Sequence, residues 1–302
     1  MDISIIVPFY NECDNVELLL RAIHTALADT LTYELILVDD GSNDSTLESL
    51  RRHAPAGSRI VALGTNYGQS TAIAVGIQQA QAEWIAMLDG DLQNDPGDIL
   101  PMLKRAQSQG YDAVMGVRAQ RRDNWLRCFP SRCANALVRS LTGVMIRDLG
   151  CTLRVVRTEY LRRVALYGEL HRFIALLVAY QGARVSDFVV AHHPRQKGVS
   201  KYEGGWTRGI AKRTLAVLAD TLWLVWWHRY RDRPLHCVLP YVALGAVCSF
   251  FAVILGVSSV WIISVWLISG LIVWGGIAQL LVQLAYERQL RESSWYRVEL
   301  CT

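Results

Sequence analysis

Two carboxylates, Asp89 and Asp91, stand one residue apart directly after an apolar run, 84–88, which is predicted to be a strand. Gln93 follows two residues later. Hard cations such as Mg²⁺ and Mn²⁺ prefer oxygen ligands and commonly connect a protein carboxylate to substrate phosphates. A lone Asp-x-Asp is usually a solvated turn, so a metal site is expected only if other strands place further polar side chains next to this pair. We predict a Mg²⁺ or Mn²⁺ site at these three side chains.

Strand-like and helix-like patterns alternate over the first 90 residues. Strands separated by helices predict parallel βαβ units and an α/β sheet, in which ligands bind at the carboxyl ends of the strands. Three of these ends carry polar residues, at 8–12, 39–40 and 89–91, so we expect one site at one sheet edge. The expected strands are 3–7, 34–38, 59–63 and 84–88, and the expected helices are 15–27, 45–52 and 69–80.

No glycine-rich phosphate loop of either common type follows the first predicted strand. Such loops are typical of dinucleotide-binding and ATP-binding folds, so both functions are disfavoured. The turn at 66–69, which contains Gly68 and Gln69, is too short to hold a polyphosphate alone.

Charge is distributed unevenly along the chain. Residues 1–117 contain 16 acidic and 6 basic side chains, whereas residues 118–172 contain 12 Arg, no Lys and 4 acidic side chains. The acidic part needs a cation to hold a phosphorylated substrate, and guanidinium groups match phosphate geometry. The basic stretch has no nucleic-acid motif or interleaved aromatic pattern, so no nucleic-acid partner is predicted.

A membrane segment is predicted near the C-terminus, because residues 234–286 contain no Asp, Glu, Lys or Arg. This length accommodates two spans, near 237–257 and 260–284. Arginines flank both ends of the run, which predicts cytoplasmic ends. Residues 206–227, with their Trp cluster, are predicted to lie at the membrane interface. The alternatives are a buried helical hairpin for the uncharged run and an amphipathic core helix for 206–227.

The cysteines support a cytosol-facing protein. Seven Cys, with no Cys-x-x-Cys spacing, are typical of reduced buried thiols and not of a disulfide framework or a zinc site. The chain enters its first predicted strand at once, so no signal peptide is expected. We divide it into a cytosolic domain at 1–203, interfacial amphipathic helices at 204–233, a membrane hairpin at 234–286 and a cytosolic tail at 287–302.

The motifs resemble a known family. VPFYNE (7–12), VDDGSND (38–44), NYGQ (66–69) and LDGDLQ (88–93) resemble the family-2 glycosyltransferases, which have the Rossmann-like GT-A fold. Five further strings resemble a narrower group, the polyprenyl-phosphate glycosyltransferases: GVR (116–118), RCFPS (127–131), RDLGCTLRVVR (147–157), ELHRF (169–173) and RQKGVSKY (195–202). Together these strings are specific for the group and poorly specific for the sugar.

The resemblance implies site residues. The catalytic residues are Asp91, Asp148, Arg195 and Lys201, with Asp148 near the acceptor sugar carbon, for positioning first and as a proton acceptor second. The acceptor phosphate is bound by Arg118, Arg127 and Ser131. The 195–202 segment closes over the diphosphate, and Asp39 faces the base. The nucleotide-sugar residues are Pro8, Tyr10, Asn11, Glu12, Asp39, Asp40, Gly68, Gln69, Asp89, Ser200 and Tyr202.

The resemblance also implies an inverting, metal-dependent transfer from a nucleotide-sugar to undecaprenyl phosphate in a bacterial inner membrane, for cell-envelope or lipid A modification, by a homotetramer. A UDP-sugar is favoured. His171-Arg172-Phe173 looks more like the mannose-synthase pattern, so GDP-mannose is the alternative donor. Two departures are Phe9 in the first motif and Gly90, where some relatives carry Ala. The alternative from another class is a non-catalytic membrane scaffold with a degenerate nucleotide-binding domain.

Overall fold

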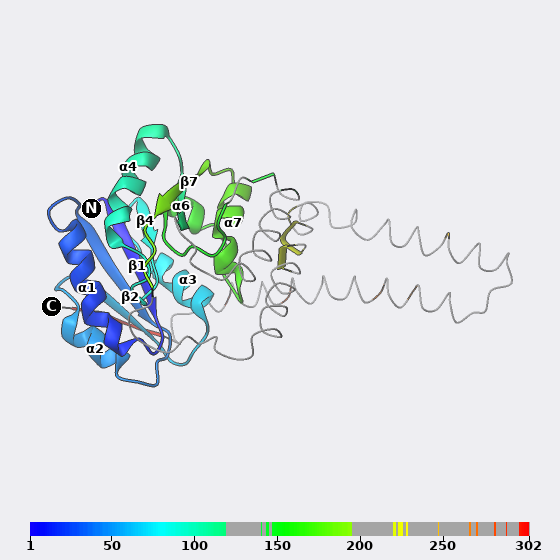
Figure 1. Cartoon of the computed structure of the whole chain (residues 1–302). Coiled ribbons are helices and arrows are strands. Elements are labelled where there is room, and N and C mark those ends of the chain that lie inside the picture. Colours follow the sequence, from blue (N-terminus) through cyan, green and yellow to red (C-terminus); the bar gives the residue numbers. More distant parts are fainter. Residues whose placement is uncertain are drawn as a thin grey trace. The chain divides into compact units, whose positions relative to one another are not determined.

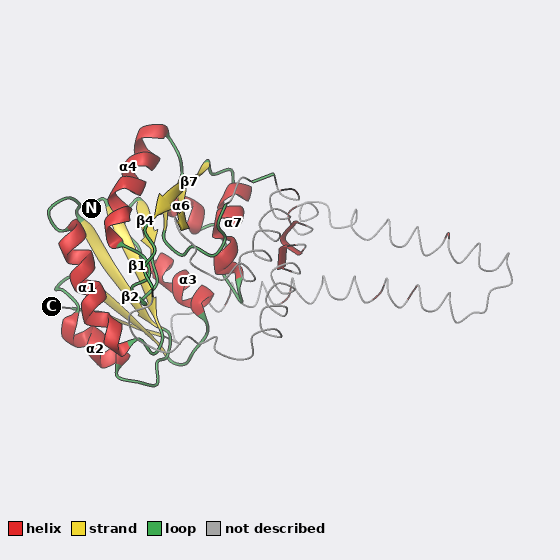
Figure 2. Ribbon diagram, in the orientation of Figure 1, coloured by secondary structure: helices red, strands yellow, loops and turns green. Residues whose placement is uncertain are grey.

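The structure is a computed structural model that describes residues 1–118, 140, 143–144, 147–194, 220–221, 223–225, 228, 247, 266, 270, 281, 288 and 296–301. The chain divides into two compact units, residues 1–219 with 292–302, and residues 220–291. The described helices and strands belong almost entirely to the first unit (Figure 2).

Eight described strands form one sheet in the order β7-β5-β6-β4-β1-β2-β3-β8. Neighbouring strands are parallel, except that β6 is antiparallel to both β4 and β5, and β8 is antiparallel to β3. The strands are β1 (Ile3–Phe9), β2 (Tyr33–Asp39), β3 (Arg59–Leu63), β4 (Trp84–Met87), β5 (Ala113–Arg118), β6 (Arg154–Arg157), β7 (Val185–Val190) and β8 (Tyr296–Leu300).

Helices cover both faces of the sheet (Figure 1). Alternate residues of β1, from Ile3 to Phe9, pack in one buried cluster with α1, α2 and α4, whereas Ile6 lies against Gly76 of α3 on the opposite face. The helices are α1 (Cys13–Leu27), α2 (Thr46–His53), α3 (Gln69–Gln79), α4 (Ile99–Gln109), α6 (Thr158–Leu161) and α7 (Ile174–Tyr180), with 3₁₀ turns η1 (Pro96–Asp98) and η2 (Leu170–Phe173).

The predicted α/β sheet is confirmed, and the four expected strands are β1 to β4. The sequence analysis did not predict β8, which lies within the predicted cytosolic tail. It pairs along the whole of β3, and Arg51 makes a two-point ion pair with Glu299 at 2.8 and 2.6 Å. Residues 296–300 of the predicted tail therefore belong to the same sheet as β1 to β4.

The predicted membrane spans at 237–257 and 260–284 lie, except for scattered positions, outside the described residues. Among the helices that the structure describes, none combines the length and apolarity needed to cross a membrane. The interfacial segment at 206–227 is likewise described at only a few positions.

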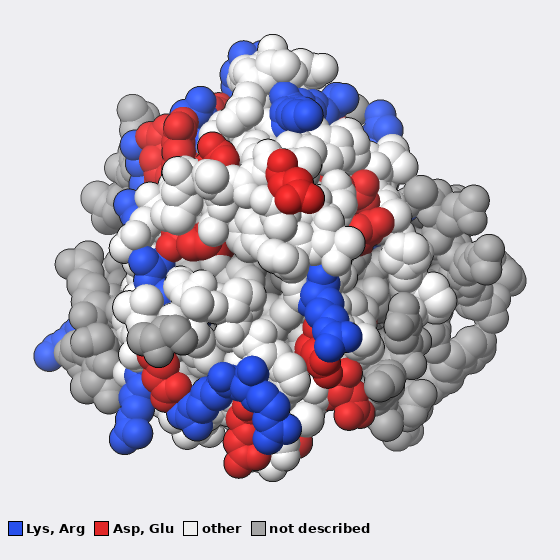
Figure 3. Space-filling view, turned by 90° about the vertical axis from the view of Figure 1, so that its left-hand side faces the viewer, with Lys and Arg blue, Asp and Glu red and all other residues white. Residues whose placement is uncertain are grey.

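Charges of both signs are interspersed on the face of the molecule shown in Figure 3. Exposed pairs such as Arg21 with Glu17, at 2.5 Å, illustrate the pattern in the described part of the chain.

Candidate active site

The polar strand ends predicted from the sequence meet at one edge of the sheet. In the register of the parallel strands, Phe9 of β1 pairs with Asp39 of β2, and Ile6 pairs with Met87 of β4. The segments that follow these strands therefore leave the sheet side by side. Pro8 and Tyr10, both half-buried, lie at the end of β1 between the other two strand ends.

Asp39 holds a carboxylate oxygen that has no partner among the described residues. The side chain is 2% exposed, and its Oδ2 accepts a hydrogen bond from the Ser42 amide at 3.2 Å. Its Oδ1 is buried without a hydrogen bond, and burial raises the pKa of Asp39. Leaving a buried acceptor unsatisfied costs about 1–3 kcal/mol, so this oxygen is suited to accept an N–H from a ligand.

Asp40, predicted beside it as a nucleotide-sugar residue, shapes the neighbouring turn. Its Oδ1 accepts from the Tyr67 amide at 2.8 Å and its Oδ2 from the Gly68 amide at 3.0 Å. Gly41 has a φ of +64°, and a Cβ there would lie 2.3 Å from the Thr65 carbonyl carbon, so only glycine fits. The Asp40 carboxylate thus fixes the loop that leads into α3, and it places Gln69 at the first position of that helix.

The loop after β1 is tied to the loop after β2. Asn11 has a φ of +55°, its amide donates to Ser42 Oγ at 3.0 Å, and its Oδ1 accepts from the Asn43 amide at 2.8 Å. The amide of Glu12 donates to Thr46 Oγ1 at 2.9 Å. These bonds tie Asn11 and Glu12 to the loop that follows Asp39.

The predicted metal residues follow β4 in one short turn. The side-chain amide of Gln69 donates to Asp89 Oδ1 at 2.7 Å, and the backbone amide of Gln93 donates to Asp91 Oδ1 at 3.2 Å. Burial and the nearby Asp91 carboxylate raise the pKa of Asp89 to about 7. A divalent cation held by the two carboxylates would relieve their repulsion, and oxygen donors of this kind fit Mg²⁺ or Mn²⁺.

Protein ligands for the cation are few in the described part of the chain, which contains no group of three or more His, Cys, Asp and Glu side chains that fits a metal ion. Two carboxylates with open positions are typical of Mg²⁺ sites completed by substrate phosphates and water.

The turn also holds Leu92 at a φ of +61°, an uncommon conformation for a residue with a side chain of this size.

Arg118 and Asp148, predicted on the acceptor side, form a two-point ion pair. Arg118 Nε donates to Asp148 Oδ2 at 2.7 Å, and its Nη2 donates to Oδ1 at 2.9 Å. The Gly150 amide also donates to Oδ1, at 3.0 Å. Both side chains are largely buried, with 14% and 8% exposed. Asp148 therefore orients the guanidinium at the end of β5, which is two strands from the metal turn.

A buried polar cluster near these residues was not predicted. Arg154 is 4% exposed and donates to the carbonyl oxygens of Cys151 at 3.1 Å, Leu149 at 3.4 Å and His171. His171 Nδ1 lies 2.9 Å from Ser70 Oγ, and burial together with the Arg154 charge lowers the pKa of His171 to about 3. The available signal was the charged residue Arg154 next to the apolar residues Leu153, Val155 and Val156.

Six of the predicted site residues lie outside the described residues: Arg127, Ser131, Arg195, Ser200, Lys201 and Tyr202. The chain just before the 195–202 segment is described, and it lies against the metal turn. The His193 amide donates to the Gln93 carbonyl at 2.8 Å, and the Ala191 amide donates to Asp98 Oδ2 at 2.8 Å.

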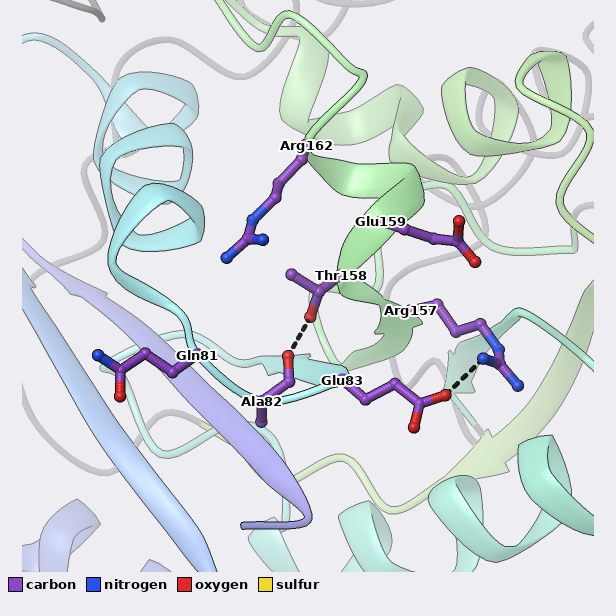
Figure 4. Close-up of a pocket in the computed structure, with 7 residues that line it drawn as sticks. All are labelled: Gln81, Ala82, Glu83, Arg157, Thr158, Glu159 and Arg162. Atoms are coloured by element: carbon purple, nitrogen blue, oxygen red, sulfur yellow. Dashed lines mark hydrogen bonds and ion pairs between the residues drawn. The ribbon is translucent and has the colours of Figure 1, made fainter.

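A cavity of about 500 Å³ lies at the amino end of β4, away from these strand ends (Figure 4). Its charged residues are already paired with the protein: Arg157 with Glu83 at 2.5 Å, and Arg162 with the Ala80 carbonyl at 2.7 Å. Thr158 donates to the Ala82 carbonyl at 2.7 Å. The cavity contains none of the predicted site residues.

Known proteins resemble this chain. The model of the family Glycosyl transferase family 2 matches residues 4–165. A dodecaprenyl-phosphate galacturonate synthase from Rhizobium johnstonii is 39% identical over 85% of this chain and 76% of its own length. An undecaprenyl-phosphate 4-deoxy-4-formamido-L-arabinose transferase from Edwardsiella ictaluri is 40% identical over 66% of this chain and 62% of its own length, so the chain spans less than two thirds of that relative.

Solved structures share the fold. Glucosyl-3-phosphoglycerate synthase from Mycobacterium tuberculosis, in complex with Mn²⁺ and UDP-glucose, has a TM-score of 0.54 at 16% identity, covering 73% of this chain and 78% of that one. At this identity the likeness concerns the fold alone. More than half of the chain matches the family model, and the resemblance to polyprenyl-phosphate sugar transferases is confirmed. This chain therefore belongs to glycosyl transferase family 2, and it is a glycosyltransferase with a GT-A fold.

Proposed function

We propose that this protein is a membrane-bound inverting glycosyltransferase that moves a sugar from a nucleotide-sugar, with a UDP-sugar favoured, to a polyprenyl phosphate such as undecaprenyl phosphate. The product serves cell-envelope glycan or lipid A modification. The observation that carries the proposal is the order of groups along the carboxyl edge of the sheet. The end of β2 carries Asp39 with its unsatisfied carboxylate oxygen. The end of β4 is followed by the carboxylate pair of the metal turn, and the end of β5 carries Arg118, which pairs with Asp148.

The donor binds at the Asp39 end. The unsatisfied Oδ1 of Asp39 accepts an N–H from the base, and the loops that carry Asn11 and Gly68 form the walls of the pocket. UDP is supported by a solved neighbour of the same fold that binds UDP-glucose. Guanine also offers an N–H to a carboxylate, so GDP-mannose remains the alternative donor.

The leaving group departs at the metal turn. Asp89, Asp91 and Gln93 would hold Mg²⁺ or Mn²⁺, and such an ion would supply positive charge to stabilise the diphosphate leaving group. Gln69 holds Asp89 in place through the 2.7 Å hydrogen bond. Arg195 and Lys201, which follow the segment that contacts Gln93, add positive charge beside the diphosphate.

The acceptor binds at the Arg118 end, with Arg127 and Ser131 as further phosphate ligands. A phosphate monoester is anionic at neutral pH, with a second pKa near ~6, so its oxygen attacks without a strong base. Asp148 is engaged by both arms of Arg118, which supports a positioning role. A single displacement of this kind inverts the configuration at the sugar carbon.

The pairing of β8 with β3 supports the membrane topology. β8 follows the uncharged run 234–286, yet it lies in the same sheet as β1 to β5. Since the chain returns to the sheet it left, any membrane crossings between these elements are even in number. Two spans, at 237–257 and 260–284, satisfy this rule and leave both termini on the cytoplasmic side. The interfacial helices at 204–233 and a homotetramer complete the proposal by resemblance.

The test is transfer by the full-length protein in lipid nanodiscs. Undecaprenyl and dodecaprenyl phosphate are offered with UDP- and GDP-activated forms of galacturonic acid, 4-deoxy-4-formamido-L-arabinose, glucose and mannose, with Mn²⁺, Mg²⁺ or EDTA. We expect one donor to yield an EDTA-sensitive lipid product with inverted configuration. A retained configuration excludes single displacement. Absence of product from every donor, with folded protein, favours the scaffold alternative.

A further inference from the structure

Arg154 lies between the two halves of the site. It is the first residue of β6, the strand inserted between β4 and β5, and it pairs with Met87 on one side and Met115 on the other. The neighbouring strand β4 ends at Met87, two residues before Asp89, and β5 ends at Arg118. Arg154 is therefore placed by the sheet at the edge where the donor side and the acceptor side meet.

Its charge has no carboxylate partner within ion-pair distance among the described residues. The guanidinium is held by three backbone carbonyls, those of Leu149, Cys151 and His171. Burying a cation without a counter-ion is strongly unfavourable, so a role limited to hydrogen bonding would not by itself account for a buried arginine at this position. The charges that act on Arg154 from a distance include Asp89 and Asp148, one from each half of the site.

The three carbonyls connect to both halves. Leu149 directly follows Asp148, which orients Arg118. His171 contacts Ser70 of α3 at two points. Its backbone amide donates to Ser70 Oγ at 3.0 Å, and its Nδ1 lies 2.9 Å from the same oxygen. Ser70 follows Gln69, which donates to Asp89. Hydrogen bonds and adjacent residues of the chain therefore connect Asp89 to the Arg118–Asp148 ion pair, and Arg154 lies at the centre of this connection.

We infer that Arg154 is a positioning residue that fixes the metal turn, residues 89–93, and the segment that carries Asp148, residues 148–151, relative to each other, and that it supplies positive charge to both. The inference deepens the proposed function and rests on it. Lysine retains the charge, but its single nitrogen cannot reach three carbonyls that the three guanidinium nitrogens hold separately. Arg154→Lys therefore separates geometry from charge.

The experiment compares Arg154→Lys with Arg59→Lys in the full-length protein. Arg59 is also largely buried, pairs with Glu34, and donates to the Gln79 carbonyl at 3.0 Å, but it lies at the amino end of β3, away from the site. Each variant is measured for thermal midpoint, for Mn²⁺ affinity by electron paramagnetic resonance, and for kcat and KM with both substrates. Ser70→Ala, which interrupts the same connection without changing charge, is the second variant.

We expect Arg154→Lys to lower kcat and Mn²⁺ affinity by about 10–100-fold, the usual effect of removing the groups that orient metal ligands. The KM for the lipid should change by less than about threefold, because Arg118 itself remains. Arg59→Lys should lower only the thermal midpoint. Unchanged kcat and Mn²⁺ affinity in folded Arg154→Lys overturns the inference, and if that variant does not fold, Ser70→Ala decides by the same criteria.

The two proposals fail in different ways. If the wild-type protein transfers no sugar, the proposed function fails, and Mn²⁺ affinity still tests Arg154. A tenfold weaker affinity in Arg154→Lys, with Arg59→Lys unchanged, then supports the positioning role, whereas equal affinities in both variants refute it.

Discussion

Gly90, between the two carboxylates of the metal turn, is predicted to tolerate no larger residue while Phe9 lies beneath it. A Cβ at position 90 would lie 2.6 Å from Phe9 Cδ1, 2.8 Å from Phe9 Cε1 and 3.2 Å from the Pro8 carbonyl oxygen. Gly90 is not among the glycines with positive φ, so its backbone conformation is open to alanine. The expected cost of Gly90→Ala is therefore steric alone.

The magnitude follows from the distance that must be regained. Ordinary contacts begin near 3.4 Å, so 0.8 Å remains to be absorbed at Phe9 Cδ1. Phe9 is 1% exposed and cannot retreat into solvent. Overpacking of this kind costs about 1–3 kcal/mol. If the turn moves instead of the ring, a shift near 1 Å at Asp89 and Asp91 lowers kcat by about 100-fold.

The assay is a double-mutant cycle of Gly90→Ala, Phe9→Leu and the double variant, measured by chemical unfolding and by transfer rate. Phe9→Leu alone leaves a small cavity, and the added methyl group at position 90 fills part of it. We expect the double variant to be more stable than the sum of the single costs predicts, with a coupling energy of at least about 1 kcal/mol. A Gly90→Ala protein with wild-type stability and rate, or strictly additive costs, would refute the reasoning.

Three further predictions follow from the site and the sheet. Asp91→Asn should lower turnover more than about 100-fold and abolish Mn²⁺ binding while the thermal midpoint stays near wild type, as calorimetry and resonance can check. Asp39→Asn should raise the donor KM by about 10–100-fold, through the lost charged hydrogen bond, without lowering the stability of the ligand-free protein. Burial by itself raises the pKa of Glu34, but hydrogen bonds from Ser4 and the Gln81 amide and the Arg59 ion pair outweigh it and hold the pKa below 4.5. The contribution of Glu34 to the free energy of unfolding should therefore be fully present above pH 4.5 and should be lost as the pH drops through the folded-state pKa. Glu34→Gln should flatten this acid dependence and lower the free energy of unfolding by about 3 kcal/mol at neutral pH.

Local patterns were sufficient for the central sheet and for the polar strand ends. The apolar runs of β1 to β4 and the helices between them are periodic over short windows, and parallel strands place their carboxyl ends at one edge whatever the details of packing. Asp39 and the Asp89–Asp91 pair were identified for this reason. The family motifs added the acceptor residues, and the structure describes Arg118 and Asp148 among them.

The hydrogen-bond partner of each polar group could not be predicted from the sequence. Asp40 has the same residue type and neighbourhood as Asp39, yet its oxygens are occupied by the amides of Tyr67 and Gly68, 27 and 28 residues away. Arg118 and Asp148 were assigned separately and are 30 residues apart in the chain, but they form one ion pair. Such pairs depend on how strands order in the sheet, which no local pattern encodes.

Residue types and their spacing are enough to predict which carboxylates and cations follow each strand at this edge of the sheet. How those groups act together depends on contacts between elements that are distant in the chain. The antiparallel insertion of β6 between β4 and β5 brings Arg154 to both halves of the site, and the Ser70–His171 contact joins residues 101 positions apart. Phe9 and Gly90 were two separate departures from the family pattern in the sequence. Packing makes them one feature, because the ring occupies the space that a side chain at position 90 would need.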